Sequence, residues 1–216
     1  MTGQARRTAA RGGPAPQQGS PAGGAGSPRG GTRERIQAVA LELFAEQGYD
    51  ATSLREIAER LGVTKAALYY HFQSKEDIVR SFSREYTADL EELIAWGSQQ
   101  PRTAASRAAI LARYADIVAG RLGVIRFMEQ NQAALHSLMG DGEERKKMVR
   151  EQFARLRDLV TPPGAQLRER VRATLAIASV GLGCMLYQSE AASPAELREV
   201  LLGIAGELAE ARPDSE

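Results

Sequence analysis

Residues 53–72 constrain the fold more than any other stretch, because they specify two short helices joined by a tight turn. Ser53 is followed three residues later by Glu56, and this spacing is the capping box that begins many helices. Gly62 comes just after the last regularly spaced apolar residue, where a left-handed residue commonly ends a helix. The first helix is therefore expected to begin after Ser53 and to end at Gly62. Its buried face is expected to consist of Leu54, Ile57, Ala58 and Leu61.

The second helix of this stretch has an unusual exposed surface. Thr64 can cap it, and Leu68 and Phe72 lie one turn apart, so they can anchor it to a core. No carboxylate occurs between Glu59 and Glu76, which leaves aromatic and cationic side chains for the exposed side. A short helix with this surface suits the major groove of DNA, and an ordinary helical hairpin is the alternative.

The sequence around this unit resembles the DNA-binding domain of the TetR family of bacterial transcriptional regulators. The resemblance covers about residues 33–80. It is carried by Phe44-Ala45-Glu46-Gln47-Gly48-Tyr49, Thr52-Ser53, Ile57-Ala58, Leu61-Gly62-Val63, Leu68-Tyr69-Tyr70-His71-Phe72 and Ser74-Lys75-Glu76. It implies a homodimeric regulator, a repressor, that binds a palindromic double-stranded DNA operator and responds to a small effector.

The same resemblance implies a set of DNA contacts in this chain. They are Ser53, Arg55, Thr64, Lys65, Ala66, Tyr69, Tyr70, His71 and Lys75. Lys65 and Arg55 are best placed for base edges, and arginine prefers guanine. Tyr70, His71 and Lys75 are expected to hold phosphates and to set the register. Few side chains are left to read bases, so DNA shape is expected to contribute to specificity.

Composition, together with the family resemblance, divides the chain into four parts. Residues 1–31 are rich in Gly, Pro and Ala, contain arginines but no acid, and are expected to form a disordered arm. Such an arm can reach DNA phosphates or the minor groove, or it can be an inert leader. Residues 32–80 are expected to form the helix-turn-helix DNA-binding domain, residues 81–211 a helical ligand-binding and dimerisation domain, and residues 212–216 a frayed tail.

Apolar residues follow helical spacing throughout the folded part, and no segment alternates like a strand, so the predicted fold class is all-α. A first helix is expected over residues 33–47 with Thr32 as its cap. A long helix is expected to begin with Ser74 and Asp77 and to continue to about residue 96. The long helix crosses the predicted domain boundary and can transmit movement between the domains. One later helix is expected to be lined by Ile110, Leu111, Tyr114, Val118 and Leu122.

The last two helices, at about residues 166–189 and 194–211, carry long apolar stripes. These stripes either complete the core or pair with the same helices of a second chain, and the family resemblance favours the pairing. The predicted dimer interface consists of Leu167, Val171, Leu175, Leu182, Leu197, Leu201, Ile204 and Leu208. Small residues such as Gly183 would allow another helix to approach closely.

The resemblance also implies an effector pocket between the DNA-binding unit and the dimer helices. Its predicted walls are Tyr114, Phe127, Met128, Asn131, Leu138, Met139, Phe153, Met185 and Tyr187. Asn131, Gln132 or His136 can serve as a polar anchor. These walls predict a small, mostly apolar effector, and tight core packing is the alternative for each residue.

Neither composition nor motif indicates an enzyme. His71 and His136 are the only histidines and Cys184 is the only cysteine. No nucleophile lies beside a base, and neither a metal-ligand cluster nor a phosphate-binding glycine motif is present, so no catalysis, cofactor or metal is expected. The single cysteine and the absence of an apolar run of about 18 residues fit a cytoplasmic protein outside the membrane.

Two other functions stay open from the sequence. One is an architectural or cell-division DNA-binding protein on the same scaffold, which would occupy many genomic sites and lack an effector pocket. The other is a helical protein–protein adaptor, which would show no salt-dependent DNA binding. The formal net charge of +1 argues only against a protein that coats nucleic acid through its whole surface.

Overall fold

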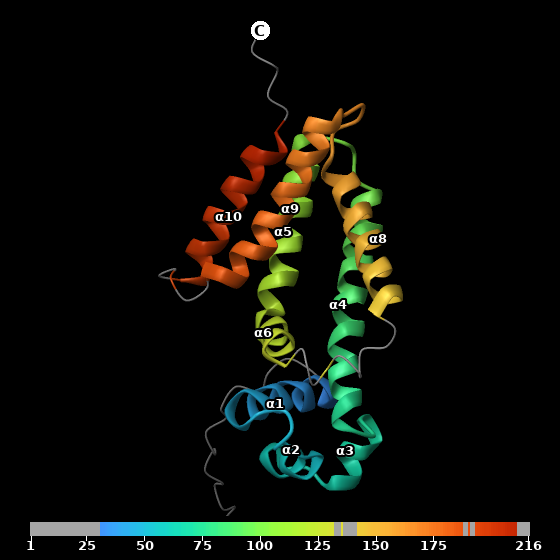
Figure 1. Cartoon of the computed structure of the whole chain (residues 1–216), viewed down its shortest axis with the longest axis vertical. Coiled ribbons are helices and arrows are strands. Elements are labelled where there is room, and N and C mark those ends of the chain that lie inside the picture. Colours follow the sequence, from blue (N-terminus) through green and yellow to red (C-terminus); the bar gives the residue numbers. More distant parts are fainter. Residues whose placement is uncertain (1–30, 132–134, 136–141, 188–189, 191–192, 211–216) are drawn as a thin grey trace, which may run out of the picture.

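The computed structural model describes residues 31–131, 135, 142–187, 190 and 193–210. Throughout these residues the only regular elements are α-helices, which confirms the predicted all-α fold class. The first three helices form one end of the molecule, and the later helices stand above them as a bundle (Figure 1). One long helix runs from this end of the molecule into the bundle.

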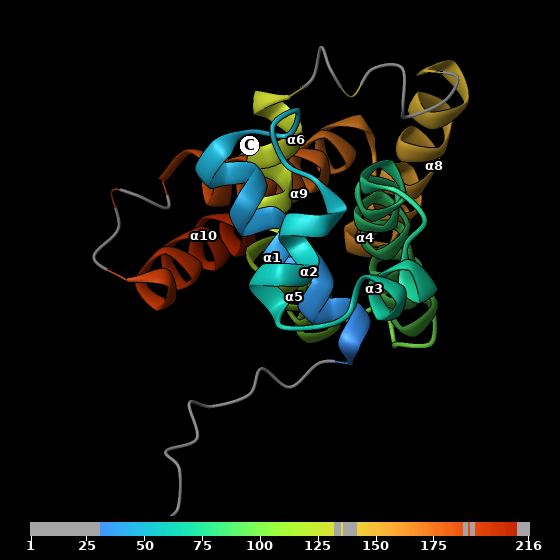
Figure 2. The ribbon, with the colours of Figure 1, turned by 90° about the horizontal axis from the view of Figure 1, so that it is seen from below.

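The N-terminal end comprises α1 (Thr32–Gln47), α2 (Leu54–Leu61) and α3 (Lys65–His71), and α3 leads into the long α4 (Lys75–Ser98). Seen from below, α1 and α2 lie side by side, and α3 lies at the foot of α4 (Figure 2). Apolar side chains from all four helices form one core. It contains Ile36, Ala40, Leu43, Phe44, Tyr49, Ile57, Ala58, Leu68, Phe72, Ile78, Val79 and Phe82, together with Phe127 and Leu135 from farther along the chain.

Predicted side-chain caps begin three of these helices. The Ser53 hydroxyl accepts the Glu56 amide at 3.3 Å, and the Glu56 carboxylate accepts the Ser53 amide at 2.8 Å, which confirms the capping box. Thr64 caps α3 by accepting a backbone amide, and Ser74 caps α4 likewise. Local sequence therefore sets where α2, α3 and α4 begin.

Two predicted details of the helices are wrong. Thr32 is not the cap of α1, because its backbone is already helical; Gly31 takes the cap position without a side-chain bond. Leu122 does not continue the helix lined by Tyr114, because the backbone leaves the helical region at Arg121 (φ −115°, ψ 6°). The Arg121 side chain there pairs with Asp89 of α4 at 2.7 Å, and a new helix begins at Leu122.

Replacing Gly62 by alanine is expected to lower the free energy of unfolding by about 1–2 kcal/mol. Gly62 adopts φ 71° and ψ 31°, and no atom lies within 4 Å of the place a Cβ would take, so the cost is purely conformational. Urea unfolding followed by circular dichroism measures it. Gly120→Ala is the matched control, because Gly120 ends α5 in the ordinary helical region with open space around it. Equal stability of the two variants would contradict the left-handed conformation of Gly62.

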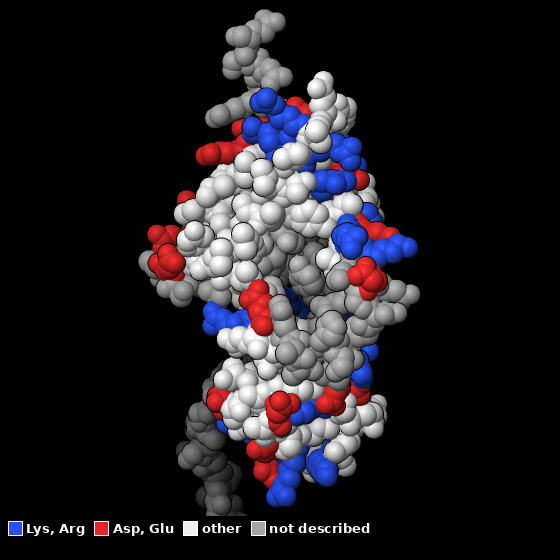
Figure 3. All heavy atoms as spheres, viewed as in Figure 1, with Lys and Arg blue, Asp and Glu red and all other residues white. Residues whose placement is uncertain are grey.

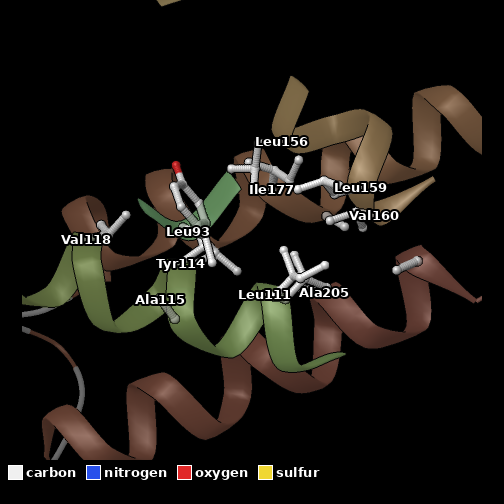
Figure 4. Packing of buried hydrophobic residues seen from close by; sticks show 14 of the residues in the cluster. Leu93, Leu111, Tyr114, Ala115, Val118, Leu156, Leu159, Val160, Ile177 and Ala205 are labelled. Atoms are coloured by element: carbon white, nitrogen blue, oxygen red, sulfur yellow. The ribbon is translucent and has the colours of Figure 1, made fainter. Parts of the chain in front are cut away.

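The bundle consists of the upper part of α4 with α5 (Ala104–Gly120), α6 (Leu122–Gln130), α8 (Gly142–Val160), α9 (Leu167–Tyr187) and α10 (Pro194–Ala209). Helices α5, α9 and α10 pack together, and α8 packs beside α4 (Figure 1). Their buried side chains form a second core around Leu111, Tyr114 and Ile177 (Figure 4). A Cβ at Gly183 would overlap the Leu201 side chain, so this glycine allows α9 to approach α10 of the same chain.

Helix α6 joins the two cores. Phe127 of α6 is 4% exposed, and its ring stacks on Phe44 of α1 with centroids 5.0 Å apart. It also meets Phe82 of α4 at 6.4 Å. The predicted domain boundary after residue 80 falls inside α4, and Phe127, from beyond that boundary, packs in the N-terminal core.

Candidate nucleic-acid interface

Helix α3 presents an exposed face at the free end of the molecule (Figure 2). Lys65 and Ala66 are exposed, and Tyr70 retains 85% of its accessible surface. Leu68 is fully buried and holds the helix on the core. The Lys65 ammonium lies 5.5 Å from the centroid of the Tyr69 ring, which is half-buried. Cationic, aromatic and small side chains are therefore displayed together on one short helix.

Both ends of α3 are fixed by side chains. At the start, the Thr64 hydroxyl accepts the Ala67 amide at 3.1 Å. At the end, Arg33 of α1 donates to the His71 carbonyl at 3.3 Å, and its guanidinium lies 4.2 Å above the Phe72 ring. Sequence reasoning missed this role of Arg33, because the contact joins residues 38 positions apart and no local pattern reports it.

The predicted contacts on α2 already have partners within the chain. The Arg55 Nε lies 2.7 Å from Glu59 Oε1, and this hydrogen bond raises the pKa of Arg55. The side chains of Arg55 and Glu59 are 77% and 61% exposed, and a solvent-exposed pair of this kind adds little stability, so Arg55 can leave it for DNA. Ser53 is held by the capping box, whose hydrogen bonds also lower the pKa of Glu56.

Lys75, the last of the predicted DNA contacts, points into the fold. Its Nζ donates to the Tyr49 carbonyl at 2.8 Å and to the Asp50 carbonyl at 3.2 Å, and lies 4.3 Å from the centroid of the Tyr49 ring. The Tyr49 hydroxyl donates to Glu76 at 2.9 Å. Burial is the largest cause of the raised pKa of Tyr49, which therefore stays neutral.

The predicted effector-pocket residues do not all come together. Tyr114 and Phe153 pack with the bundle core, whereas Phe127 and Met128 pack with the N-terminal core. These two pairs therefore line different cores rather than one wall.

Three of the remaining predicted pocket residues lie at the ends of α6 and α9. Asn131, which follows the last residue of α6, donates to the Phe127 carbonyl at 2.9 Å. Met185 is half-buried and Tyr187 is 50% exposed at the end of α9. Leu138 and Met139, with the suggested anchors Gln132 and His136, lie outside the described residues.

A hydrogen-bonded pair of tyrosines lies at the bundle core, and sequence reasoning did not identify this pair. Tyr86 of α4 and Tyr114 of α5 hydrogen bond through their side chains, and burial raises the pKa of both phenols. A Cβ at Gly181 of α9 would lie 3.0 Å from the Tyr114 hydroxyl, so three helices meet there. Tyr86 occupies an apolar stripe of α4 in the sequence, and its hydroxyl partner becomes evident only in three dimensions.

The predicted dimer face is largely uncovered. Figure 3 shows that the surface over α9 and α10 is mostly free of charged side chains, whereas the α1–α3 end carries both signs. Exposed fractions on the predicted face are 77% for Leu167, 47% for Val171, 50% for Leu175, 53% for Leu182 and 44% for Ile204. Leu186 and Val200, which sequence reasoning omitted, extend it at 52% each.

Three residues predicted for the same face lie deeper. Leu197 and Leu201 are 9% and 5% exposed, because α10 turns them onto the core of its own chain, where Leu201 meets Gly183. Leu208 is partly buried against that core. These residues therefore support the exposed face from beneath and do not form it.

The described residues offer neither a membrane-spanning helix nor a metal site. No helix there is both long and apolar enough to cross a membrane. No cluster of His, Cys, Asp and Glu side chains in that part of the chain could hold a metal ion.

The sequence similarity to known proteins lies in the N-terminal end of the molecule, from α1 to the start of α4. Residues 36–82 match the family described as bacterial regulatory proteins, tetR family. The HTH-type transcriptional regulator AcrR of Shigella flexneri is 53% identical over 47 residues, which are 22% of this chain and 22% of that protein. The HTH-type transcriptional repressor KstR2 of Rhodococcus jostii is 39% identical over 69 residues, 30% of this chain and 34% of that protein. The matches thus span about a fifth to a third of these relatives.

Solved structures match over most of the chain. A transcriptional regulator of the TetR/AcrR family from Thermobifida fusca is 26% identical, with a TM-score of 0.53 over 81% of this chain and 96% of that one. The TetR family regulator PfmR from Thermus thermophilus shares the fold at 24% identity, with a TM-score of 0.58 over 86% of this chain and 100% of that one. The helix-turn-helix end therefore carries the sequence match to the tetR family of bacterial regulatory proteins, and the bundle completes a fold that is shared with regulators of that family.

Proposed function

We propose that this protein is a ligand-responsive transcriptional repressor that binds a palindromic DNA operator as a homodimer. The single observation that carries the proposal is the exposed face of α3, with Lys65 and Tyr70 displayed on a helix whose two ends are fixed. A helix held in this way is preorganised for the major groove. KstR2, named a repressor, supports the sign of regulation.

The proposed contacts divide by chemistry. Lys65 and, after leaving Glu59, Arg55 would reach base edges. Tyr69, Tyr70 and His71 would contact the DNA backbone or the apolar edge of a base, while Ala66 would permit close approach. Ser53 and Thr64 would act mainly through the helix starts that they cap, since helix N-termini attract phosphate.

The first experiment is a selection of bound sequences from a random duplex library by the full-length protein. The expected result is an inverted repeat whose half-site centres are one helical turn, about 34–36 Å, or a multiple of it apart. Affinity should fall steeply with salt, because bound cations displace counterions from DNA. Salt-sensitive binding without an inverted repeat would favour the architectural protein, and the absence of salt-dependent binding would favour the adaptor.

A homodimer would form through α9 and α10. The exposed apolar side chains of Val171, Leu175, Leu182, Leu186 and Ile204 favour coverage by a second copy of the same surface. Such a face suits a four-helix interface between two identical pairs. The dimer would set the separation of the two α3 helices, which a palindrome requires.

The effector would be a small, mostly apolar and neutral molecule with a hydrogen-bond acceptor. Tyr86 and Tyr114 are the polar groups that support this class, because their phenol hydroxyls lie at an apolar core and a hydroxyl can donate a hydrogen bond to a ligand. Ligand binding would change operator affinity only through its different affinities for the two states of the dimer. Titration of the selected duplex against a panel of neutral esters, ketones and amides tests this proposal. If molecules that bind the bundle leave duplex affinity unchanged, the protein is not regulated by them.

A further inference from the structure

The start of α4 holds the loop between α1 and α2. Lys75 is the first residue of α4 and is half-buried, and its ammonium donates to the carbonyls of Tyr49 and Asp50 at 2.8 and 3.2 Å. The next residue, Glu76, accepts the Tyr49 hydroxyl at 2.9 Å. Two consecutive residues of one helix therefore hold the backbone and the side chain of the same tyrosine.

From this geometry we infer that Lys75 is a positioning residue that fixes the helix-turn-helix unit on α4, and not a contact to DNA phosphate. The inference rests on the proposed DNA-binding function. It assigns to Lys75 a part different from the one that the family resemblance implies.

The chemistry of the Lys75 ammonium favours a positioning role. A lysine ammonium has three N–H donors, and two of them are directed at carbonyl oxygens. The ammonium also faces the Tyr49 ring at 4.3 Å, which attracts a cation. A phosphate would have to compete with all three interactions. Lys65 differs, since it is exposed and has only the Tyr69 ring as a partner in the described part of the chain.

The contacts of Lys75 and Glu76 with the loop before α2 form a clamp on Tyr49. Tyr49 connects this clamp to the N-terminal core. It is 5% exposed, and its ring meets Phe44 edge-on at 5.2 Å and Phe127 at 6.1 Å. The loop at residues 48–53 leads directly into α2, and α2 leads through Gly62 into α3. Fixing Tyr49 on α4 therefore fixes where α2 and α3 lie relative to the helix that enters the bundle.

The test compares Lys75→Met and Lys65→Met in full-length protein on the duplex chosen by the selection above. Affinity is measured from about 50 to 200 mM salt. A positioning role predicts that Lys75→Met weakens binding about tenfold, because hydrogen bonds to a charged group are lost, while the slope of log K against log salt stays as in the wild type. Lys65→Met is the matched control at the DNA face, and it should lose discrimination between the selected duplex and random DNA.

A phosphate contact predicts a different result for the same variant. The salt slope would then fall by about 0.9 for each phosphate lost, and this outcome overturns the inference. Lys75→Arg keeps the charge but replaces the compact ammonium by a planar fork, so a positioning role predicts weakened binding for it as well. Wild-type affinity of Lys75→Arg would equally overturn the inference.

Two outcomes of this series separate the inference from the proposed function. If the wild-type protein selects no duplex, the proposed function fails, and the clamp can still be examined by hydrogen exchange at residues 48–52. Those amides should exchange faster in Lys75→Met than in Lys65→Met, and equal rates would refute the clamp. If a duplex is selected and the salt slope falls in Lys75→Met, only the inference fails.

Discussion

Replacing Phe127 by alanine is expected to lower the free energy of unfolding by about 3–5 kcal/mol, the usual cost of removing a buried phenylalanine. Phe127 is 4% exposed and touches the rings of Phe44, Tyr49 and Phe82 at 5.0, 6.1 and 6.4 Å. Its loss leaves a cavity and removes three aromatic contacts that join α6 to the N-terminal core. Urea unfolding followed by circular dichroism measures the change.

Met148→Ala is the control for this variant. Met148 is 48% exposed on α8, and its truncation should change the free energy of unfolding by no more than about 0.5 kcal/mol. The contrast tests more than burial, because the N-terminal helices are expected to lose protection from hydrogen exchange in Phe127→Ala before the bundle does. A loss below about 1 kcal/mol for Phe127→Ala would show that α6 does not hold the two cores together.

The second large effect is expected for the double substitution Leu175→Glu and Leu182→Glu on α9. These side chains are 50% and 53% exposed in a single chain, so the glutamates cost little in the monomer. In a dimer each would be a buried charge without a partner, and this is strongly unfavourable. The variant is expected to be a folded monomer with operator affinity reduced roughly 100-fold or more, as for the loss of central interface residues.

Sedimentation velocity and light scattering measure the oligomeric state, and circular dichroism measures whether the monomer is folded. Val149→Glu is the matched control, because Val149 is an apolar residue of α8 with 54% exposure outside the proposed interface. It should remain dimeric and bind DNA normally. A double variant that is still dimeric would place the interface elsewhere, and a monomeric wild type would remove the dimer from the proposed function.

The two experiments concern residues that sequence reasoning treated differently. The spacing of Leu175 and Leu182 defined an apolar stripe, and the family resemblance assigned that stripe to the interface; both side chains are exposed. Phe127 was predicted for a ligand pocket, but it packs in the N-terminal core. The spacing of apolar residues indicates which side of a helix is buried, and it carries no information about which helix covers that side.

Sequence alone determined the features that depend on residues within one helical turn. The capping box at Ser53 and Glu56, the caps at Thr64 and Ser74, and the left-handed Gly62 each arise from a hydrogen bond or a backbone preference between near neighbours. The motifs of the helix-turn-helix end therefore sufficed to indicate both its fold and its family.

The tertiary structure alone decided the contacts that join distant residues. Leu201 and Ile204 lie on the same helix three residues apart, yet one is 5% exposed and the other 44%, because Gly183 of α9 receives Leu201. Likewise, Lys75 contacts carbonyl oxygens 25 and 26 residues earlier in the chain, and Arg33 reaches the end of α3. Each such contact depends on how whole helices pack, and packing is fixed by the shapes of many side chains together and not by any local pattern.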